Sequence, residues 1–348
     1  MAFFTPQFNK SFLGFIGIKR ASISLSILIF FFVLSLFSEF IANDKPIFIR
    51  YEGKNYLFSA FKFYPDTQFG GRHNTRAQYR ELAKSPQFAK NSKNFMIFPP
   101  VPYGPNYINL NELHGNPPSP PDRHHIMGTD NKGRDIFARL LYGLRISLTF
   151  ALILLVLEIV IGIVVGGVQG FFGGKVDLIV QRLIEILSSM PFLYITILFS
   201  KIFGRSIVTL IVIMTIFNWI GLSYYMRSEF LRLKQFQFVE AARSMGVGNF
   251  KIIISEILPN ALVPVITFAP FSIIASISSL SALDYLGFGL PPDIPTWGEL
   301  IGQGMENLSS YWLSVFPLAV LFTTLLLTAF VGEGLRTALD PRKYNKVE

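Results

Sequence analysis

Six apolar runs, each about as long as a membrane-spanning helix, constrain the fold of this chain more than any other feature. A helix needs about 20 mostly apolar residues to cross a bilayer. The third run is the weakest candidate, because it contains Arg182, Glu185 and Lys201. The sequence therefore predicts an all-α membrane protein with six transmembrane helices. The predicted spans are Ala21–Ala42, Ile146–Val168, Ile179–Phe203, Ser206–Met226, Ala261–Leu283 and Tyr311–Val331.

Composition favours a lipid environment over an aqueous one. Hydrophobic residues make up 51% of the 348 residues and charged residues 15%, whereas soluble domains carry about 25% charged residues. The net charge of +9 is better explained by basic cytoplasmic loops than by a nucleic-acid partner, since no basic run is dense. The absence of cysteine excludes disulfides and Cys-ligated metals. We expect a lipid bilayer as partner and no nucleic acid.

Basic residues in the short loops predict the orientation, because cytoplasmic loops carry an excess of Lys and Arg. The segment Asp284–Ser310 contains neither residue type. Six spans with both termini in the cytoplasm place every basic region inside and this segment outside. The basic residues are Lys10, Lys19 and Arg20 before the first span, Arg227, Arg232, Lys234, Arg243 and Lys251 after the fourth, and Arg336, Arg342, Lys343 and Lys346 in the tail.

The first span has two interpretations. Lys19 and Arg20 precede it, as in a signal peptide. Its apolar run is long, however, and no small-residue cleavage pattern follows near Glu39. These features favour a retained membrane anchor.

These spans divide the chain into four predicted regions. Residues 1–42 form an amino-terminal cytoplasmic segment with the first helix, and residues 43–125 a large, irregular periplasmic insertion. Residues 126–340 form a five-helix core with a cytoplasmic loop at 227–258, and residues 341–348 a cytoplasmic tail.

The insertion holds 11 of the 21 prolines. Tyr51–Tyr56 predicts a small hairpin with Gly53 in its turn. The insertion either caps the extracytoplasmic face or docks a soluble binding protein, and the two roles are compatible.

The loop at 227–258 contains a polar, helix-prone stretch between two spans. Phe236–Met245 predicts a helix, which Gly246 ends in the left-handed conformation. Val239, Ala242 and Met245 lie at helical spacing and predict an apolar face. A second helix from Asn249 is expected to run into the fifth span, with Pro259 near its membrane entry. An interfacial helix lying on lipid explains the apolar face, but not the paired alanines or the fixed Gly and Pro offsets.

This stretch resembles the Glu-Ala-Ala loop of the membrane-spanning subunits of bacterial ABC importers. In that family the loop contacts the ATPase subunits. The resemblance implies an ATPase-coupling site, which consists of Val239, Glu240, Ala241, Ala242, Arg243, Met245, Gly246 and Pro259.

Two further segments strengthen the resemblance. His125–Asp135 and Asp284–Leu300 are similar to segments before the second span and between the last two spans of oligopeptide and dipeptide permeases. The tail Leu339–Arg342 is similar as well. The long insertion departs from ordinary dipeptide permeases, and its Phe61–Gly71 and Pro117–Pro121 stretches resemble the Yej-type permease of microcin C and oligopeptide importers.

The segment before the second span is a candidate periplasmic gate or structural motif. Its charged side chains either bind substrate or form a network that orients the span, and the network is favoured. The residues are Gly128, Thr129, Asp130, Gly133, Arg134 and Asp135.

No stretch predicts an ATPase. A P-loop requires Gly-x-x-x-x-Gly-Lys followed by Ser or Thr, whereas Gly174-Lys175 is followed by Val176, and Gln169 stands where the first Gly is required. The chain is therefore expected to be a transport subunit without catalytic residues or cofactors. The resemblance implies ATP and Mg on cytoplasmic ATPase subunits, a second permease subunit, a periplasmic substrate-binding protein and a peptide substrate, at a bacterial inner membrane.

Other polar residues leave alternatives open. Glu158 lies mid-span, where a carboxylate is either functional or packed against a neighbouring helix. It is the coupling site if the chain is instead an ion-driven secondary transporter, and a third alternative is a non-transporting membrane scaffold. The histidines show no metal-ligand spacing. Glycines 162, 166, 167 and 170 predict close helix packing, and Asn218, Ser276, Ser278, Ser279 and Ser281 either line a path or pack helices.

Overall fold

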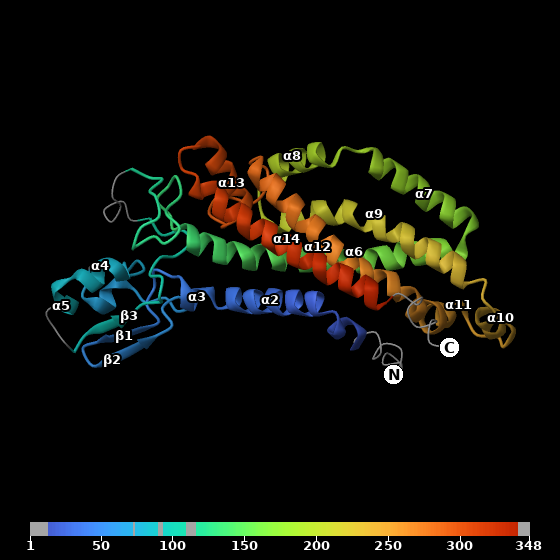
Figure 1. Cartoon of the computed structure of the whole chain (residues 1–348), viewed down its shortest axis with the longest axis horizontal. Helices are drawn as coiled ribbons and strands as arrows, with labels where there is room; N and C mark the ends of the chain where they lie inside the picture. Colours follow the sequence, from blue (N-terminus) through green and yellow to red (C-terminus); the bar gives the residue numbers. More distant parts are fainter. Residues whose placement is uncertain (1–12, 72–73, 90–92, 109–115, 340–348) are drawn as a thin grey trace. The chain divides into compact units, whose positions relative to one another are not determined.

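The computed structural model describes residues 13–71, 74–89, 93–108 and 116–339 (Figure 1). This part of the chain contains five helices long and apolar enough to cross a membrane, or six if one bent pair counts as a span. The five are α2 (Lys19–Leu36), α6 (Ile136–Phe172), α9 (Ile207–Leu233), α12 (Leu258–Tyr285) with the helical turns that precede it, and α14 (Trp312–Ala338).

The third predicted span is not one straight helix. It forms α7 (Gly174–Ser189) and α8 (Phe192–Phe203), which are bent by 78° relative to one another. Pro191 explains the break, because a proline disfavours helical backbone in the residue before it. Met190 accordingly has extended backbone, with ψ at 125°. This pair is either a broken span or a re-entrant loop, so the number of spans depends on it.

The second span begins earlier than its apolar run predicts. Helix α6 starts at Ile136, where the run of apolar residues starts only at Ile146. The Oδ1 atom of Asp135 accepts a hydrogen bond from the backbone N–H of Ala138 at 2.8 Å, which satisfies a free donor at the helix start. The additional turns contain charged residues, and hydropathy alone therefore misses them.

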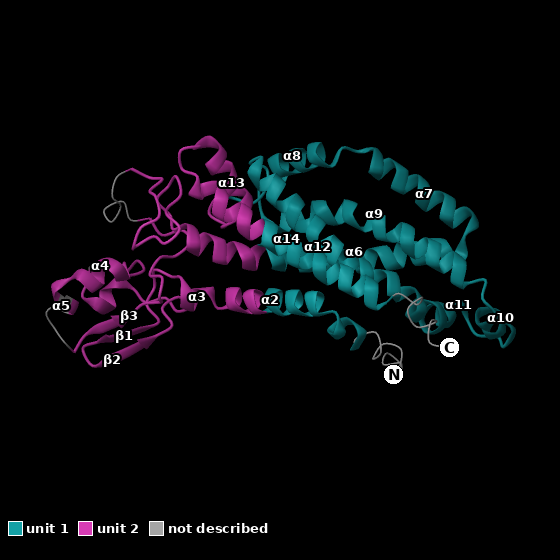
Figure 2. Cartoon of the chain, viewed as in Figure 1, with its two compact units in different colours: residues 1–29, 147–291, 322–348 teal, residues 30–146, 292–321 magenta. Residues whose placement is uncertain are grey.

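The chain divides into two compact units (Figure 2). Unit 1 comprises residues 1–29, 147–291 and 322–348, and unit 2 comprises residues 30–146 and 292–321. Because the chain crosses between them several times, each unit is assembled from segments far apart in the sequence.

Unit 2 contains a three-stranded antiparallel sheet in the order β2-β1-β3. Strand β1 (Phe48–Tyr51) and β2 (Lys54–Leu57) form the predicted hairpin, in which Tyr51 pairs with Lys54. Glu52 and Gly53 form its turn with positive φ angles of 48° and 77°, as tight hairpins require. Strand β3 (Phe95–Ile97) pairs with the other edge of β1.

An aromatic core supports this sheet, so the insertion is more regular than the sequence predicts. Phe69 is fully buried, and its ring lies 5.2 Å from that of Tyr56 and 5.7 Å from that of Tyr51. Ring packing of this kind adds to the stabilisation that burial of apolar area supplies. The remaining elements of unit 2 are α3 (Ser38–Ile41), η1 (Asp66–Phe69), α4 (Tyr79–Lys84), α5 (Pro86–Ala89) and α13 (Trp297–Glu306).

Close packing of α6 against α9 organises unit 1. A Cβ atom at Gly166 would lie 2.3 Å from the carbonyl oxygen of Ser223, and one at Gly170 would lie 2.5 Å from that of Arg227. Backbones approach this closely only where glycine removes the side chain. The predicted packing role of these glycines is confirmed.

Candidate functional site

The helix predicted in the polar loop is α10 (Gln237–Ser244). Gly246 ends it with φ at 77°, as predicted. The N–H of Gly246 donates to the carbonyl of Arg243 at 2.9 Å, and that of Val247 to the carbonyl of Ala242 at 3.0 Å. A left-handed glycine allows the chain to reverse and satisfy these last carbonyl groups.

The predicted apolar face of α10 is divided in the structure. Val239 and Ala242 are buried in the core of unit 1, whereas Met245 is 75% exposed. Glu240 and Ala241 are exposed as well. The inner face of α10 is thus fixed to its own chain, and a small outer surface remains open.

The inner face of α10 contacts the segment that leads into α12. Val239 and Ala242 share a buried cluster with Ile252, Ile257 and Ala261. These three belong to a helical run formed by α11 (Asn249–Lys251), the π-helical segment η3 (Ile252–Ile257) and α12. The predicted second helix is confirmed, and Pro259 stands in the first turn of α12, directly after the π-helical segment η3.

The loop that contains α10 and the end of α9 before it are also tied to α6 and α7. The Nζ atom of Lys234 donates to the carbonyl of Gly170 at 2.8 Å, and the guanidinium of Arg243 lies over the ring of Phe171 at 5.5 Å. Arg227 makes two hydrogen bonds of 2.6 Å to the carboxylate of Asp177. These contacts join the loop that contains α10 to the ends of α6 and α7.

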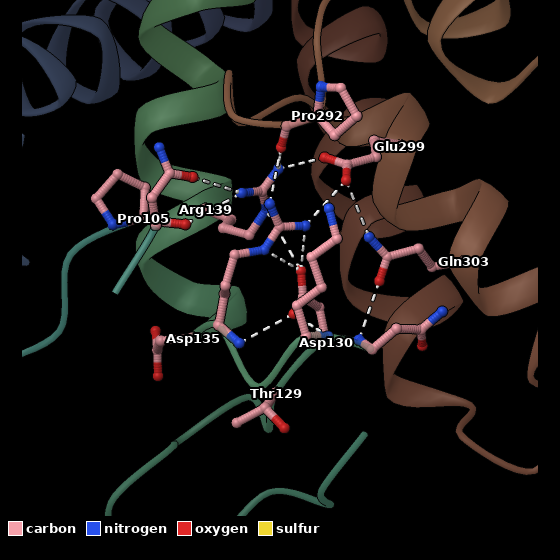
Figure 3. A network of polar contacts seen from close by, with 12 residues as sticks. Pro105, Thr129, Asp130, Asp135, Arg139, Pro292, Glu299 and Gln303 are labelled. Atoms are coloured by element: carbon pink, nitrogen blue, oxygen red, sulfur yellow. Dashed lines mark hydrogen bonds and ion pairs between the residues drawn. The ribbon is translucent and has the colours of Figure 1, made fainter. Parts of the chain in front are cut away.

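A network of buried charges forms around the start of α6 in unit 2 (Figure 3). Arg134 Nε donates to Asp130 Oδ2 at 2.6 Å, and Arg134 Nη2 donates to Glu299 Oε1 at 2.9 Å. Arg134 Nη1 also donates to the carbonyl of Pro292 at 2.7 Å. Burial by itself would lower the pKa of Arg134, but Asp130 and Glu299 raise it above its ordinary value. The guanidinium therefore stays charged and joins three segments.

Arg139 completes the network. Its side chain is fully buried and forms an ion pair with Glu299. Its Nη1 donates to the carbonyl of Pro105 at 3.0 Å and to Asn106 Oδ1 at 3.2 Å. Glu299 and Arg139 were not among the predicted site residues. The available signal was that Arg139 stands just ahead of an apolar run. An arginine that is buried there has to find a hydrogen-bond acceptor.

The predicted motif residues hold the loop before α6 in shape. Asp130 Oδ1 accepts the backbone N–H groups of Lys132 and Arg134, each at 2.9 Å. Gly128 and Gly133 adopt φ angles of 79° and 80°, which favour glycine. Such contacts are typical of a turn fixed by its own side chains.

Thr129 and Asp135 make the remaining contacts of the motif. Thr129 Oγ1 accepts the N–H of Ser119 at 2.8 Å, and the indole of Trp312 donates to the Thr129 carbonyl at 3.3 Å. Asp135 Oδ2 lies 2.8 Å from His125 Nδ1. All six motif residues of this loop contribute to one folded arrangement, which favours the structural interpretation over substrate binding.

The histidines that the structure describes make local contacts. The ring of His125 lies 4.2 Å from that of Tyr103. The backbone N–H groups of His125 and His124 donate to Asp122 Oδ1 at 2.5 and 2.8 Å respectively. Desolvation would raise the pKa of Asp122, but these hydrogen bonds lower it below its ordinary value. His73 and His114 lie outside the described residues.

Glu158 is buried, and its Oε1 accepts a hydrogen bond of 3.0 Å from Ser272 of α12. This contact gives the mid-span carboxylate a partner on a neighbouring helix. A helix-packing role is thereby sufficient to explain the residue.

Comparisons with known proteins identify the family. Residues 158–344 match the model of the binding-protein-dependent transport system inner membrane component. The chain is 39% identical to the peptidoglycan transport system permease protein YejE of Agrobacterium fabrum, over 98% of this chain and 94% of that protein. It is 41% identical to the inner membrane ABC transporter permease protein YejE of Escherichia coli, over 93% of this chain and 94% of the relative.

A more distant relative aligns with only part of this chain. The dipeptide transport system permease protein DppC of Bacillus subtilis is 34% identical over 64% of this chain and 70% of its own length. The chain belongs to the family of binding-protein-dependent transport system inner membrane components. It is therefore a multi-pass inner-membrane permease subunit, and the resemblance noted in the sequence is confirmed.

Proposed function

We propose that this chain is the membrane-spanning permease subunit of an ATP-driven importer for peptides, either oligopeptides or microcin C-like peptides. The observation that carries the proposal is the two-sided α10. One face is buried against the helical run into α12, and the other leaves Glu240, Ala241 and Met245 exposed. A helix arranged in this way is suited to receive a force from a partner and pass it to a membrane span.

The partners follow from the family and from the charge distribution. A cytoplasmic ATPase, with its ATP and Mg, docks on α10, and a second permease subunit completes the translocation path. Both termini and the α10 loop lie in the cytoplasm, and six spans result if α7 and α8 together cross the membrane once. A periplasmic binding protein delivers the substrate. Peptide as the substrate class is supported by the dipeptide transport system permease protein among the relatives.

The mechanism is alternating access. ATP binding closes the ATPase dimer and displaces α10. Because α10 shares a buried cluster with η3 and α12, these segments move with α10. The π-helical segment η3 and the prolines at 264 and 270 are positions at which this helical run can bend. The substrate is transported because its affinity differs between the two states.

An ion-driven transporter is the rival function, since Glu158 is a buried intramembrane carboxylate. It predicts uptake by this chain under an ion gradient without an ATPase. The Glu158–Ser272 contact accounts for the carboxylate without such a role.

Site-specific photo-crosslinking tests the docking surface. A photoreactive amino acid replaces Met245 on the outer surface of α10, and in a matched control it replaces Leu308, which is 76% exposed in unit 2. Cross-links to the ATPase subunit from position 245 and not from position 308 are expected. Equal yields, or none at 245, would contradict docking at α10.

A further inference from the structure

A loop in the insertion of unit 2 exposes several aromatic rings to its surroundings. It begins at Leu57, the last residue of strand β2, and ends at Phe63. Phe61 is 62% exposed and Phe63 is 57% exposed. The rings of Phe58 and Phe61 both pack near the ring of Phe40. Exposed apolar clusters of this kind mark contact surfaces for a membrane or another protein.

The loop is held in a fixed shape. Phe58 has a φ angle of 55°, which is unusual for a bulky residue and persists only where the surroundings impose it. Its N–H donates to the carbonyl of Ile47 at 2.9 Å, and its own carbonyl accepts the N–H of Phe61 at 2.9 Å. The hydroxyl of Tyr64 donates to the carbonyl of Leu57 at 3.0 Å. The aromatic side chains are thus presented by a constrained backbone.

The loop continues the outer surface of the first membrane helix. Phe58 and Phe61 each lie with their ring centre 6.0 Å from that of Phe40 in α3. Phe40 lies three residues after exposed Phe37 and seven after exposed Val33, across the break between α2 and α3 at Phe37. Val33 belongs to the apolar helix α2, and its side chain and that of Phe37 are 44% and 55% exposed. The aromatic loop therefore lies beside the short helix that follows the first candidate span.

The chemistry of the loop fits the boundary between lipid and water. Aromatic residues are enriched at this depth. Lys62 stands exposed between Phe61 and Phe63, and a lysine stem lies along apolar surface while its ammonium group reaches the headgroups. A protein partner that covered the loop would also have to cover the exposed apolar residues Val33 and Phe37 beside it.

We propose that Leu57–Phe63 is an interfacial membrane anchor, in which Phe58, Phe61 and Phe63 insert among the lipids of the outer leaflet beside the first span. The anchor fixes the height and tilt of the insertion above the membrane. It does not depend on the substrate or on the energy source of the transporter.

The absence of native cysteines allows a direct test. A nitroxide is attached to Lys62→Cys in the full chain, which is reconstituted in nanodiscs with and without its partner subunits. Power saturation compares access of apolar oxygen with access of a water-soluble nickel chelate. The control is Lys54→Cys in the same unit. Lys54 lies next to the turn of the β1–β2 hairpin. It is three residues before Leu57, which is about 10 Å along the strand at 3.3 Å per residue.

We expect the label at 62 to favour oxygen and the label at 54 to favour the nickel chelate. Replacing Phe58, Phe61 and Phe63 with Ser should shift position 62 towards the aqueous pattern and leave position 54 unchanged. Nickel access at 62 equal to that at 54 would overturn the proposal. Loss of access to both reagents only when the partner subunits are present would overturn it as well, and would show a protein contact.

Discussion

Arg134 and Glu299 lie 165 residues apart in the sequence, and their side chains meet at 2.9 Å. Arg139 binds the second oxygen of the same carboxylate. Glu299 thus joins helix α13 to both the loop before α6 and the first turn of α6. One carboxylate holds two buried guanidinium groups, and each of these in turn binds backbone carbonyls of other segments.

Removing Glu299 should destabilise the protein strongly. Glu299→Ala removes the nearer charge partner of buried Arg139 and leaves it only the 3.8 Å contact with Asp130. Breaking a buried pair in this way costs about 3–5 kcal/mol. Glu299→Gln keeps a hydrogen-bond acceptor and should cost less. The matched control is Glu306→Ala, which changes an exposed residue of the same helix. Chemical unfolding in detergent measures the difference, and equal stability of the Glu299 and Glu306 alanine variants would contradict the structural role.

Adding one methyl group between α6 and α9 should separate these helices. In Gly166→Ala the new Cβ would lie 2.3 Å from the Ser223 carbonyl oxygen. Overpacking of this kind destabilises by about 1–3 kcal/mol. Gly221→Ala in α9 meets nothing within 4 Å and should be neutral or stabilising, because alanine favours helix over glycine. The account of the helix contact fails if the two variants shift the unfolding temperature in the same direction.

Replacing Glu158 with Gln should leave transport nearly unchanged. The amide oxygen of Glu158→Gln can still accept the hydrogen bond from Ser272. We expect uptake within about twofold of the wild-type rate, because the hydrogen bond is kept. A tenfold effect would require the activation free energy of transport to change by about 1.4 kcal/mol. Uptake abolished by Gln under conditions that preserve the folded protein would instead support proton coupling at this residue.

Stability should depend on pH through Asp122. The folded state lowers the pKa of this carboxyl group, so the charged form stabilises the fold above the ordinary carboxyl pKa. The contribution disappears as the pH falls through the lowered pKa. The unfolding temperature of wild type should therefore exceed that of Asp122→Ala at pH 7, and the difference should shrink in acid. A difference that grows on acidification would contradict the sign.

Local features with one clear physical cause could be predicted from the sequence. The left-handed Gly246, the Glu52-Gly53 hairpin turn and the contact at Gly166 each follow from a glycine in a defined pattern. The proposed coupling role of the α10 loop rests on its resemblance to known permeases. Its division into a buried and an exposed face did not, because Val239 and Met245 are equally apolar and only the packing distinguishes them.

Features that depend on distant partners could not be predicted. The sequence shows that Arg139 precedes an apolar run, but only the fold brings Glu299 to it. Hydropathy also treated Ile179–Phe203 as one run, although Pro191 separates two helices bent by 78°. In the first case a distant partner decides the geometry, and in the second a single proline does so, which an average over neighbouring residues conceals.

The central claim is that ATP hydrolysis on a partner subunit drives transport through α10. Its most direct test is peptide uptake into proteoliposomes that contain the chain, its second permease, the ATPase subunits and the binding protein. Gly246→Val places a β-branched residue at φ 77°, whereas Gly248→Val changes a residue with φ −66°, where valine is tolerated. We predict vanadate-sensitive, ATP-dependent uptake that falls sharply in Gly246→Val and persists in Gly248→Val. Uptake driven by a proton gradient without ATP, or unaffected by Gly246→Val, would contradict the account.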